Sequence, residues 1–143
     1  MKIYLAGPLF TAPELRWNED LAIELRSHGH QVWLPQEHSD TEMTALEIFN
    51  KDVEGLDWCE VIVACLDQPD PDSGTSWELG YCWRNKFCYY YRSDFRNSGD
   101  WKGVRINIML EKSTIELFPS EYTVYALTRA INTAIKIHAG GAP

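Results

Sequence analysis

Long apolar runs are missing from this sequence of 143 residues. No segment approaches the ~18 consecutive apolar residues that a membrane-spanning helix needs, so we expect no membrane partner. The first residues, Met1–Gly7, form a segment that is too short and too soon interrupted to be a signal peptide. We therefore expect a cytoplasmic protein.

Positive charge is also scarce, with 13 Lys and Arg against 21 Asp and Glu and a formal net charge of −8. A net-negative surface repels phosphate backbones, so we expect no nucleic-acid partner, whereas small neutral ligands remain compatible with it. Cys-x-x-Cys clips are absent and the histidines lack ligand spacing. We therefore expect no metal site, and interpret the four cysteines as buried free thiols: Cys59, Cys65, Cys82 and Cys88.

Three common catalytic or cofactor-binding fingerprints are missing as well. There is no Gly-x-Gly-x-x-Gly for a dinucleotide, no Gly-x-x-x-x-Gly-Lys-Ser/Thr for a triphosphate, and no Gly-x-Ser-x-Gly nucleophile elbow. What remains is carboxylate chemistry. Paired acids suit glycosidic bonds, because one carboxylate attacks the anomeric carbon while another acid protonates the leaving group.

The apolar fraction of 45% and the charged fraction of 24% are ordinary for a globular chain, and the length predicts one domain over residues 1–143. Composition and periodicity predict strands at 2–6, 31–34, 60–66, 87–91 and 106–110. They predict helices from the capping box at 11–14 to Gly29, and at 45–56, 77–83 and 121–137, with a frayed tail at 139–143. This alternation predicts an α/β fold, a flavodoxin- or Rossmann-like sandwich whose five-stranded, mostly parallel sheet has helices on both faces.

Ligands of open α/β sheets bind outside the carboxyl ends of the strands, where the loops 7–12, 35–42 and 67–74 are expected. The third loop carries Asp67, Asp70 and Asp72 and opens the helix that contains Glu78. Asp72 or Ser73 can cap that helix, and we interpret Asp70 as a surface residue. A glutamate in the first turns is favoured by the helix dipole alone, so a structural and a functional role for Glu78 both stay open at this point.

Three segments resemble the nucleoside 2-deoxyribosyltransferase family: Ile3–Phe10, Asn50–Leu56 and Asp72–Gly80. The resemblance runs from Ile3 to about Met109 and includes Tyr91–Arg96 and Asn107–Met109. It implies an enzyme that transfers 2-deoxyribose between purine or pyrimidine bases, with a glutamate nucleophile, side hydrolysis and no cofactor. The implied partners are deoxynucleosides and free nucleobases.

The resemblance also implies a role for individual residues. Glu78 matches the nucleophile, Tyr4 the tyrosine that orients it, and Asp52 and Asp72 the aspartates that bind the sugar hydroxyl and assist base departure, with the proton donor left open. Asn107 and Met109 match residues supplied by a neighbouring subunit, which implies a homo-oligomer, a dimer or a hexamer. The implied substrate-binding residues are Gly7, Phe10, Gln36, Asn107 and Met109.

A related branch hydrolyses deoxynucleoside 5′-monophosphates, and its first loop carries small hydroxyl residues and an arginine. Here residues 7–12 are apolar and contain no arginine, so free nucleosides are the favoured substrates. Arg92 or Arg96 could still reach a phosphate. A nucleotide-binding module without catalysis is the third hypothesis.

Overall fold

The computed structural model describes residues 1–138. All five strands are parallel and run in the order β2-β1-β3-β4-β5, which is the flavodoxin-like order and confirms the predicted fold class. The strands are β1 (Lys2–Ala6), β2 (Gln31–Trp33), β3 (Val61–Cys65), β4 (Phe87–Tyr91) and β5 (Ile115–Glu116). The helices are α1 (Ala12–Ser27), α2 (Ala45–Trp58), α3 (Ser73–Cys82), α4 (Ile108–Ser113) and α5 (Val124–His138), with a 3₁₀ turn at Pro35–Glu37.

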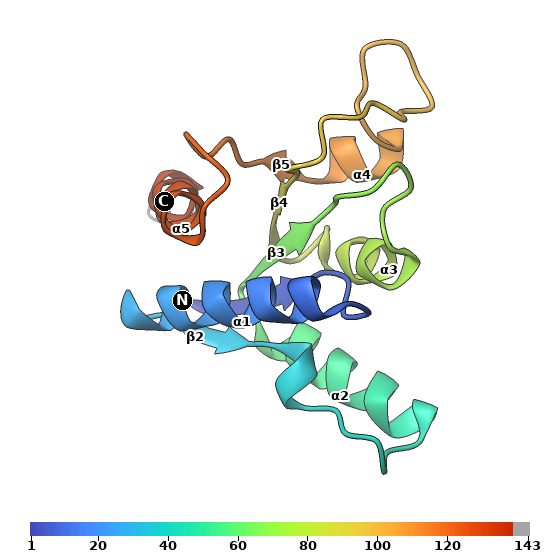
Figure 1. The fold of residues 1–143 in the computed structure, drawn as a ribbon, viewed down its shortest axis with the longest axis vertical. Helices are drawn as coiled ribbons and strands as arrows, with labels where there is room; N and C mark the ends of the chain where they lie inside the picture. Colours follow the sequence, from blue (N-terminus) through green and yellow to red (C-terminus); the bar gives the residue numbers. More distant parts are fainter. Residues whose placement is uncertain (139–143) are drawn as a thin grey trace.

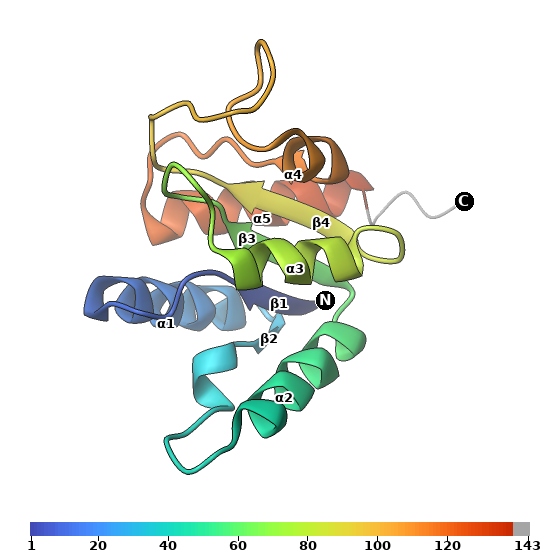
Figure 2. The same ribbon diagram turned by 90° about the vertical axis from the view of Figure 1, so that its right-hand side faces the viewer.

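Helices cover both faces of the sheet (Figures 1 and 2). Side chains of α1 and α5 pack on one face, where Leu21 and Leu127 are fully buried. Side chains of α2, α3 and α4 pack on the other face, against Tyr4 and Tyr90. The central strand β3 is buried along its whole length, as its continuous apolar run predicts for a strand covered on both sides.

Two capping boxes fix the starts of α1 and α2. Thr11 and Glu14 make the reciprocal bonds predicted from the sequence, and Thr44 and Glu47 repeat them in α2. Gly29 has φ +85°, as expected of the glycine that follows a helix. The four cysteines are buried and free, which confirms that prediction.

The predicted strand at 106–110 is wrong, because residues 108–113 form α4. The Asn107 side chain caps this helix by accepting a hydrogen bond from the Met109 amide at 3.0 Å. Asp100 accepts another from the Ile108 amide at 2.8 Å. The fifth strand lies just beyond the helix, where Ile115 and Glu116 pair with Tyr89 and Tyr90 of β4.

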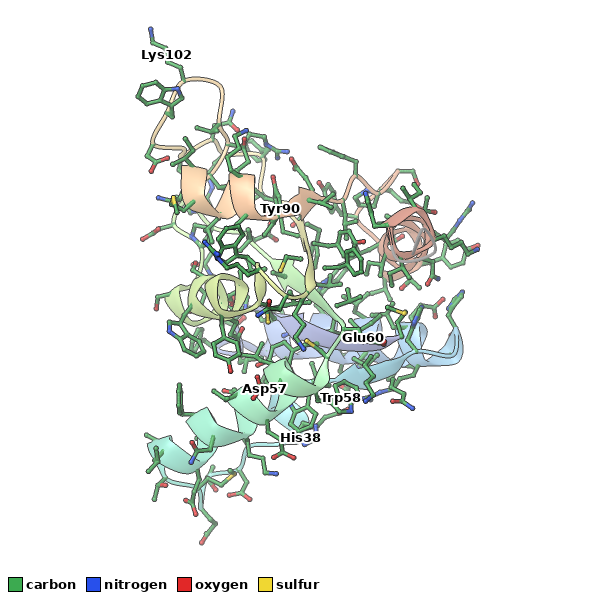
Figure 3. All side chains as sticks on the ribbon, turned by 180° about the vertical axis from the view of Figure 1, so that it is seen from behind. His38, Asp57, Trp58, Glu60, Tyr90 and Lys102 are labelled. Atoms are coloured by element: carbon green, nitrogen blue, oxygen red, sulfur yellow. The ribbon has the colours of Figure 1, made fainter. Side chains whose placement is uncertain are left out.

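The beginning of α2 projects beyond the sheet (Figures 1 and 2). Its apolar spacing predicts buried positions, yet Leu46 is 67% and Phe49 48% exposed, and only Gly55 and Leu56 at its end are buried. A long loop between β4 and α4 also stands away from the sheet, with Lys102 near its outer end (Figure 3). Within residues 1–138, no helix combines the length and the apolar character needed to cross a membrane. The predicted frayed tail, 139–143, lies outside the described residues.

Candidate active site

A tyrosine on the sheet and a glutamate on a helix form the centre of the site. Tyr4 lies in the middle of β1 with its side chain fully buried under α2 and α3. Its hydroxyl donates a 2.6 Å hydrogen bond to Oε1 of Glu78, in the second turn of α3. Glu78 also lines a cavity, so the tyrosine orients a carboxyl group that belongs to a cavity wall.

Burial raises the pKa of Glu78 to about 7. The charges of Asp52 and Asp72 act in the same direction, while the hydrogen bond from Tyr4 opposes them. The pKa of Tyr4 is raised by its burial and by the Glu78 charge, so the phenol keeps its proton and remains a donor. A carboxylate with a pKa near neutrality is typical of catalytic sites.

A cavity of about 320 Å³ opens beside Glu78 between α2 and α3. Asp52, in the second turn of α2, contributes a second acid to its wall. Partial burial raises the pKa of the Asp52 carboxyl, and the nearby His38 opposes that rise. Among the described residues, the lining consists of Phe49, Asp52, Gly74, Trp77 and Glu78.

Asp72 is the N-cap of α3. Its Oδ2 accepts hydrogen bonds from the Thr75 amide at 2.8 Å and the Thr75 hydroxyl at 3.0 Å. Both bonds fix the first turn of the helix that carries Glu78, so Asp72 combines a capping role with a negative charge near the nucleophile candidate.

Close packing at Gly55 sets the position of α2. A Cβ atom at Gly55 would lie 2.4 to 2.6 Å from the Trp33 indole, so only glycine allows this approach. Trp33 is the β2 register partner of Tyr4, and its ring also contacts His38 and Trp58, which Figure 3 labels. Asp52 precedes Gly55 by about one helical turn, so this contact brings the acid towards Tyr4 and Glu78.

Three predicted substrate-binding residues do not belong to the cavity lining within residues 1–138. Gly7 follows β1, and a Cβ there would lie 3.2 Å from Cβ of Cys65 on β3. Phe10 is 77% exposed and directly precedes Thr11, the N-cap of α1. Gln36 donates a 3.0 Å hydrogen bond to the Leu15 carbonyl, and its buried Oε1 has no hydrogen-bond partner among the described residues.

Asn107 is the N-cap of α4 and Met109 lies in its first turn. Met109 is 74% exposed and borders a separate cavity with Ser76, Gly80 and Trp83. The side-chain amide of Asn107 donates to Asp100 at 2.9 Å. Within residues 1–138, Met109 thus lines a different cavity from the one that Glu78 lines.

The two arginines considered for phosphate binding are engaged elsewhere. Arg92 is fully buried, and its guanidinium donates to the carbonyls of Leu66, Gln68 and Arg96. Arg96 forms an ion pair with Asp94. Both side chains therefore stabilise the loops that follow β3 and β4.

Phe49 and Trp77 are site residues that the sequence analysis missed. A weak signal was present, since Phe49 precedes Asp52 by three residues on one helix face and Trp77 directly precedes Glu78. Among residues 1–138, no three His, Cys, Asp or Glu side chains are grouped so that they could hold a metal ion.

The chain is similar in fold to three solved structures. The 2-deoxyribosyltransferase of Bacillus psychrosaccharolyticus is 24% identical, with 89% of this chain and 96% of that chain covered and a TM-score of 0.68. The 2-deoxyribosyltransferase of Leishmania mexicana is 23% identical, with 95% of this chain and 97% of that chain covered and a TM-score of 0.71. The CMP N-glycosidase of Clostridium botulinum is 14% identical, with 93% of this chain and 99% of that chain covered and a TM-score of 0.63. At these identities the likeness shows the fold alone.

A comparison with curated protein sequences finds no match. The family model for nucleoside 2-deoxyribosyltransferase, in contrast, matches residues 3–109, which is most of the chain and spans Tyr4, Asp52, Asp72 and Glu78. The chain therefore belongs to the nucleoside 2-deoxyribosyltransferase family and is a pentosyltransferase enzyme.

Proposed function

We propose that this enzyme transfers the 2-deoxyribosyl group between the purine and pyrimidine bases of free deoxynucleosides by double displacement, with hydrolysis as a side reaction. The observation that carries the proposal is the Tyr4–Glu78 pair, with a 2.6 Å hydrogen bond, at the wall of a cavity shared with Asp52. A carboxylate held in one direction, with its other oxygen free, is suited to attack an electrophilic carbon.

In the first half-reaction a carboxylate oxygen of Glu78 forms a bond to C1′ of the deoxyribose. The C1′–N bond breaks, its electron pair goes to the base, and the base nitrogen takes a proton from a carboxyl group. The acidic surroundings stabilise the oxocarbenium-like transition state. In the second half-reaction a new base attacks C1′, returns its proton to the same group and releases Glu78. Water in place of the new base gives hydrolysis.

Asp52 is the better candidate for the proton donor. It lines the cavity, and burial raises the pKa of its carboxyl, which favours the protonated form. Asp72, in contrast, does not belong to the cavity lining among the described residues, and one of its oxygens already accepts two hydrogen bonds from Thr75. We therefore assign Asp72 to helix capping and sugar binding, and Asp52 to the departing base.

Free nucleosides are the proposed substrates, because phosphate recognition would need a cation that no residue of the first loop supplies. Arg92 and Arg96 are already paired, as described above. The alternative activity is hydrolysis of deoxynucleoside 5′-monophosphates. Its support is the fold that this chain shares with a CMP N-glycosidase.

One assay separates the candidate functions. The protein is incubated with thymidine plus adenine, with deoxyinosine plus adenine, and with dCMP alone, and the products are identified by chromatography. The proposal predicts deoxyadenosine in the first two mixtures and little release of cytosine from dCMP. Rapid cytosine release without base exchange would favour the glycosidase, and no product from any mixture would favour a binding module.

A further inference from the structure

Three aromatic rings form a continuous strip between α2 and α3 at the mouth of the site. The Phe49 and Trp77 ring centroids are 5.7 Å apart at an angle of 57°, and those of Trp77 and Tyr81 are 5.3 Å apart at 24°. The Tyr81 hydroxyl donates a 2.8 Å hydrogen bond to Oδ1 of Asp57 on α2, which holds the outer ring in place. The first two rings, Phe49 and Trp77, line the cavity that contains Asp52 and Glu78; we call them the aromatic wall.

The aromatic wall is only half covered by the protein itself. Phe49 and Trp77 are each 48% exposed, although rings of this size contribute much of the apolar area of a core when buried. Their position beside two carboxyl groups distinguishes them from scattered apolar residues on a surface. A ligand that enters the cavity to reach Glu78 therefore meets apolar rings and acids together.

The chemistry of the site indicates which part of a nucleoside meets the aromatic wall. The base is bonded directly to the carbon that Glu78 attacks, so it lies within a few ångströms of that carboxylate. Phe49 is one turn before the proposed proton donor Asp52, and Trp77 directly precedes Glu78. The sugar hydroxyls need polar partners, whereas a nucleobase presents a flat π face that stacks on aromatic rings.

We infer that Phe49 and Trp77 bind the nucleobase of donor and acceptor by stacking, and that this contact sets the affinity for the base. The inference rests on the proposed function. Every base has a π face, so stacking admits both purines and pyrimidines, and the larger face of a purine gains more contact.

Substitutions at Trp77 test the inference in the transferase assay. Trp77→Ala should raise the KM for adenine by roughly tenfold, because it removes one ring from the stack, with a smaller change in kcat. Trp77→Phe, which keeps a ring, should restore most of the affinity, and Phe49→Ala should behave as Trp77→Ala does. The control is Tyr125→Ala, which removes a 58% exposed ring from α5 on the opposite face of the sheet.

Binding of free adenine provides a readout that does not depend on turnover. In a Glu78→Gln background, adenine should quench tryptophan fluorescence, and Trp77→Phe should remove most of the quenching while changing the Kd by less than about threefold. Circular dichroism shows whether each variant is folded. Quenching that survives Trp77→Phe, or an unchanged Kd in a folded Trp77→Ala variant, would overturn the stacking assignment.

The remaining outcomes separate this inference from the proposed function. A wild-type protein that neither exchanges bases nor binds adenine would overturn both. Normal exchange with an unchanged KM in Trp77→Ala would overturn only the aromatic wall. A change in oligomeric state of Trp77→Ala on gel filtration, with KM unaltered, would also overturn it and would instead assign the ring to a contact between subunits.

Discussion

Tyr4 and Glu78 are 74 positions apart in the sequence, yet the tyrosine hydroxyl lies 2.6 Å from the glutamate carboxyl. The bond joins the central part of the sheet to the helix that follows the third strand. Because the phenol is buried and its pKa is raised, it keeps its proton at every physiological pH and donates a hydrogen bond to Glu78.

Tyr4→Phe should shift the pH dependence of activity. Removing the hydroxyl removes a hydrogen bond that favours ionised Glu78, so the pKa of this proposed nucleophile rises from about 7 and the acidic limb of kcat/KM moves to higher pH. A hydrogen bond to a charged group contributes roughly 1.5–3 kcal/mol, so kcat/KM at pH 6 should fall roughly tenfold or more. The loss should be smaller at pH 9.

Tyr90→Phe is the matched control for this shift. Tyr90 is equally buried and donates a 2.8 Å hydrogen bond to Oε2 of Glu116, outside the site (Figure 3 labels Tyr90). Its profile should keep the position of the wild-type acidic limb. An unshifted limb in Tyr4→Phe, or the same shift in both variants, would contradict the role assigned to Tyr4.

Glu78→Gln should stabilise the protein at alkaline pH. Between pH 4.5 and about 7 the folded protein keeps the Glu78 proton that the unfolded chain has lost, so the free energy of unfolding falls as pH rises through this window. Glutamine does not titrate, so the variant should match the wild type at pH 5 and exceed it by on the order of 3 kcal/mol at pH 8.

Urea unfolding at both pH values measures this difference. Glu54→Gln, at an exposed position of α2, is the control, and its free energy of unfolding should equal that of the wild type at both pH values. A Glu78→Gln variant that is no more stable than the wild type at pH 8 would show that Glu78 is not held at a raised pKa.

Two substitutions at Asp72 separate its cap from its charge. Asn is as good an N-cap as Asp, so Asp72→Asn should keep the stability of the wild type. In Asp72→Ala the free energy of unfolding should fall by about 1 kcal/mol. Both remove a charge that raises the pKa of Glu78, so the acidic limb of kcat/KM should move to lower pH in both. Thermal unfolding and pH-rate profiles measure the two effects. Equal stability of the two variants would argue against the capping role.

A mixing experiment tests whether subunits share their sites. Glu78→Ala and Asn107→Ala should each be nearly inactive alone and recover activity when co-expressed, because in a mixed dimer one site carries both changes and the other neither. Random exchange makes half the dimers mixed, so recovery should approach about a quarter of wild-type activity. Background activity in verified mixed dimers would mean that Asn107 does not complete the Glu78 site of a neighbour.

Local signals explain why much of the fold could be predicted from the sequence. Thr11 and Glu14 form their capping box within one turn, and the continuous apolar run of β3 indicates that this strand is buried on both faces. The segment at 106–110 is different. Its residues fit either a strand or a helix, and the contact that favours the helix, from the Ile108 amide to Asp100, spans the intervening loop.

In the candidate site, too, some features could be predicted from the sequence and others depend on tertiary packing. The resemblance indicated Tyr4, Asp52, Asp72 and Glu78, but residue types and spacing carry no information on the Tyr4–Glu78 bond, which depends on how α3 returns to the sheet. Phe49 has the spacing of a core residue and lines the cavity instead, because α2 extends past the edge of its packing partners. Such exposure is a property of tertiary packing.

The central claim is that Glu78 carries the sugar, and the mass of the intact protein tests it most directly. After incubation with a 2′-fluoro deoxynucleoside analogue that slows release of the sugar, the wild type should gain the mass of one fluorinated deoxyribosyl group per chain. Peptide mapping should place it on Glu78, and Glu78→Gln should stay unmodified. An adduct on another residue, or an equal adduct in Glu78→Gln, would contradict the account.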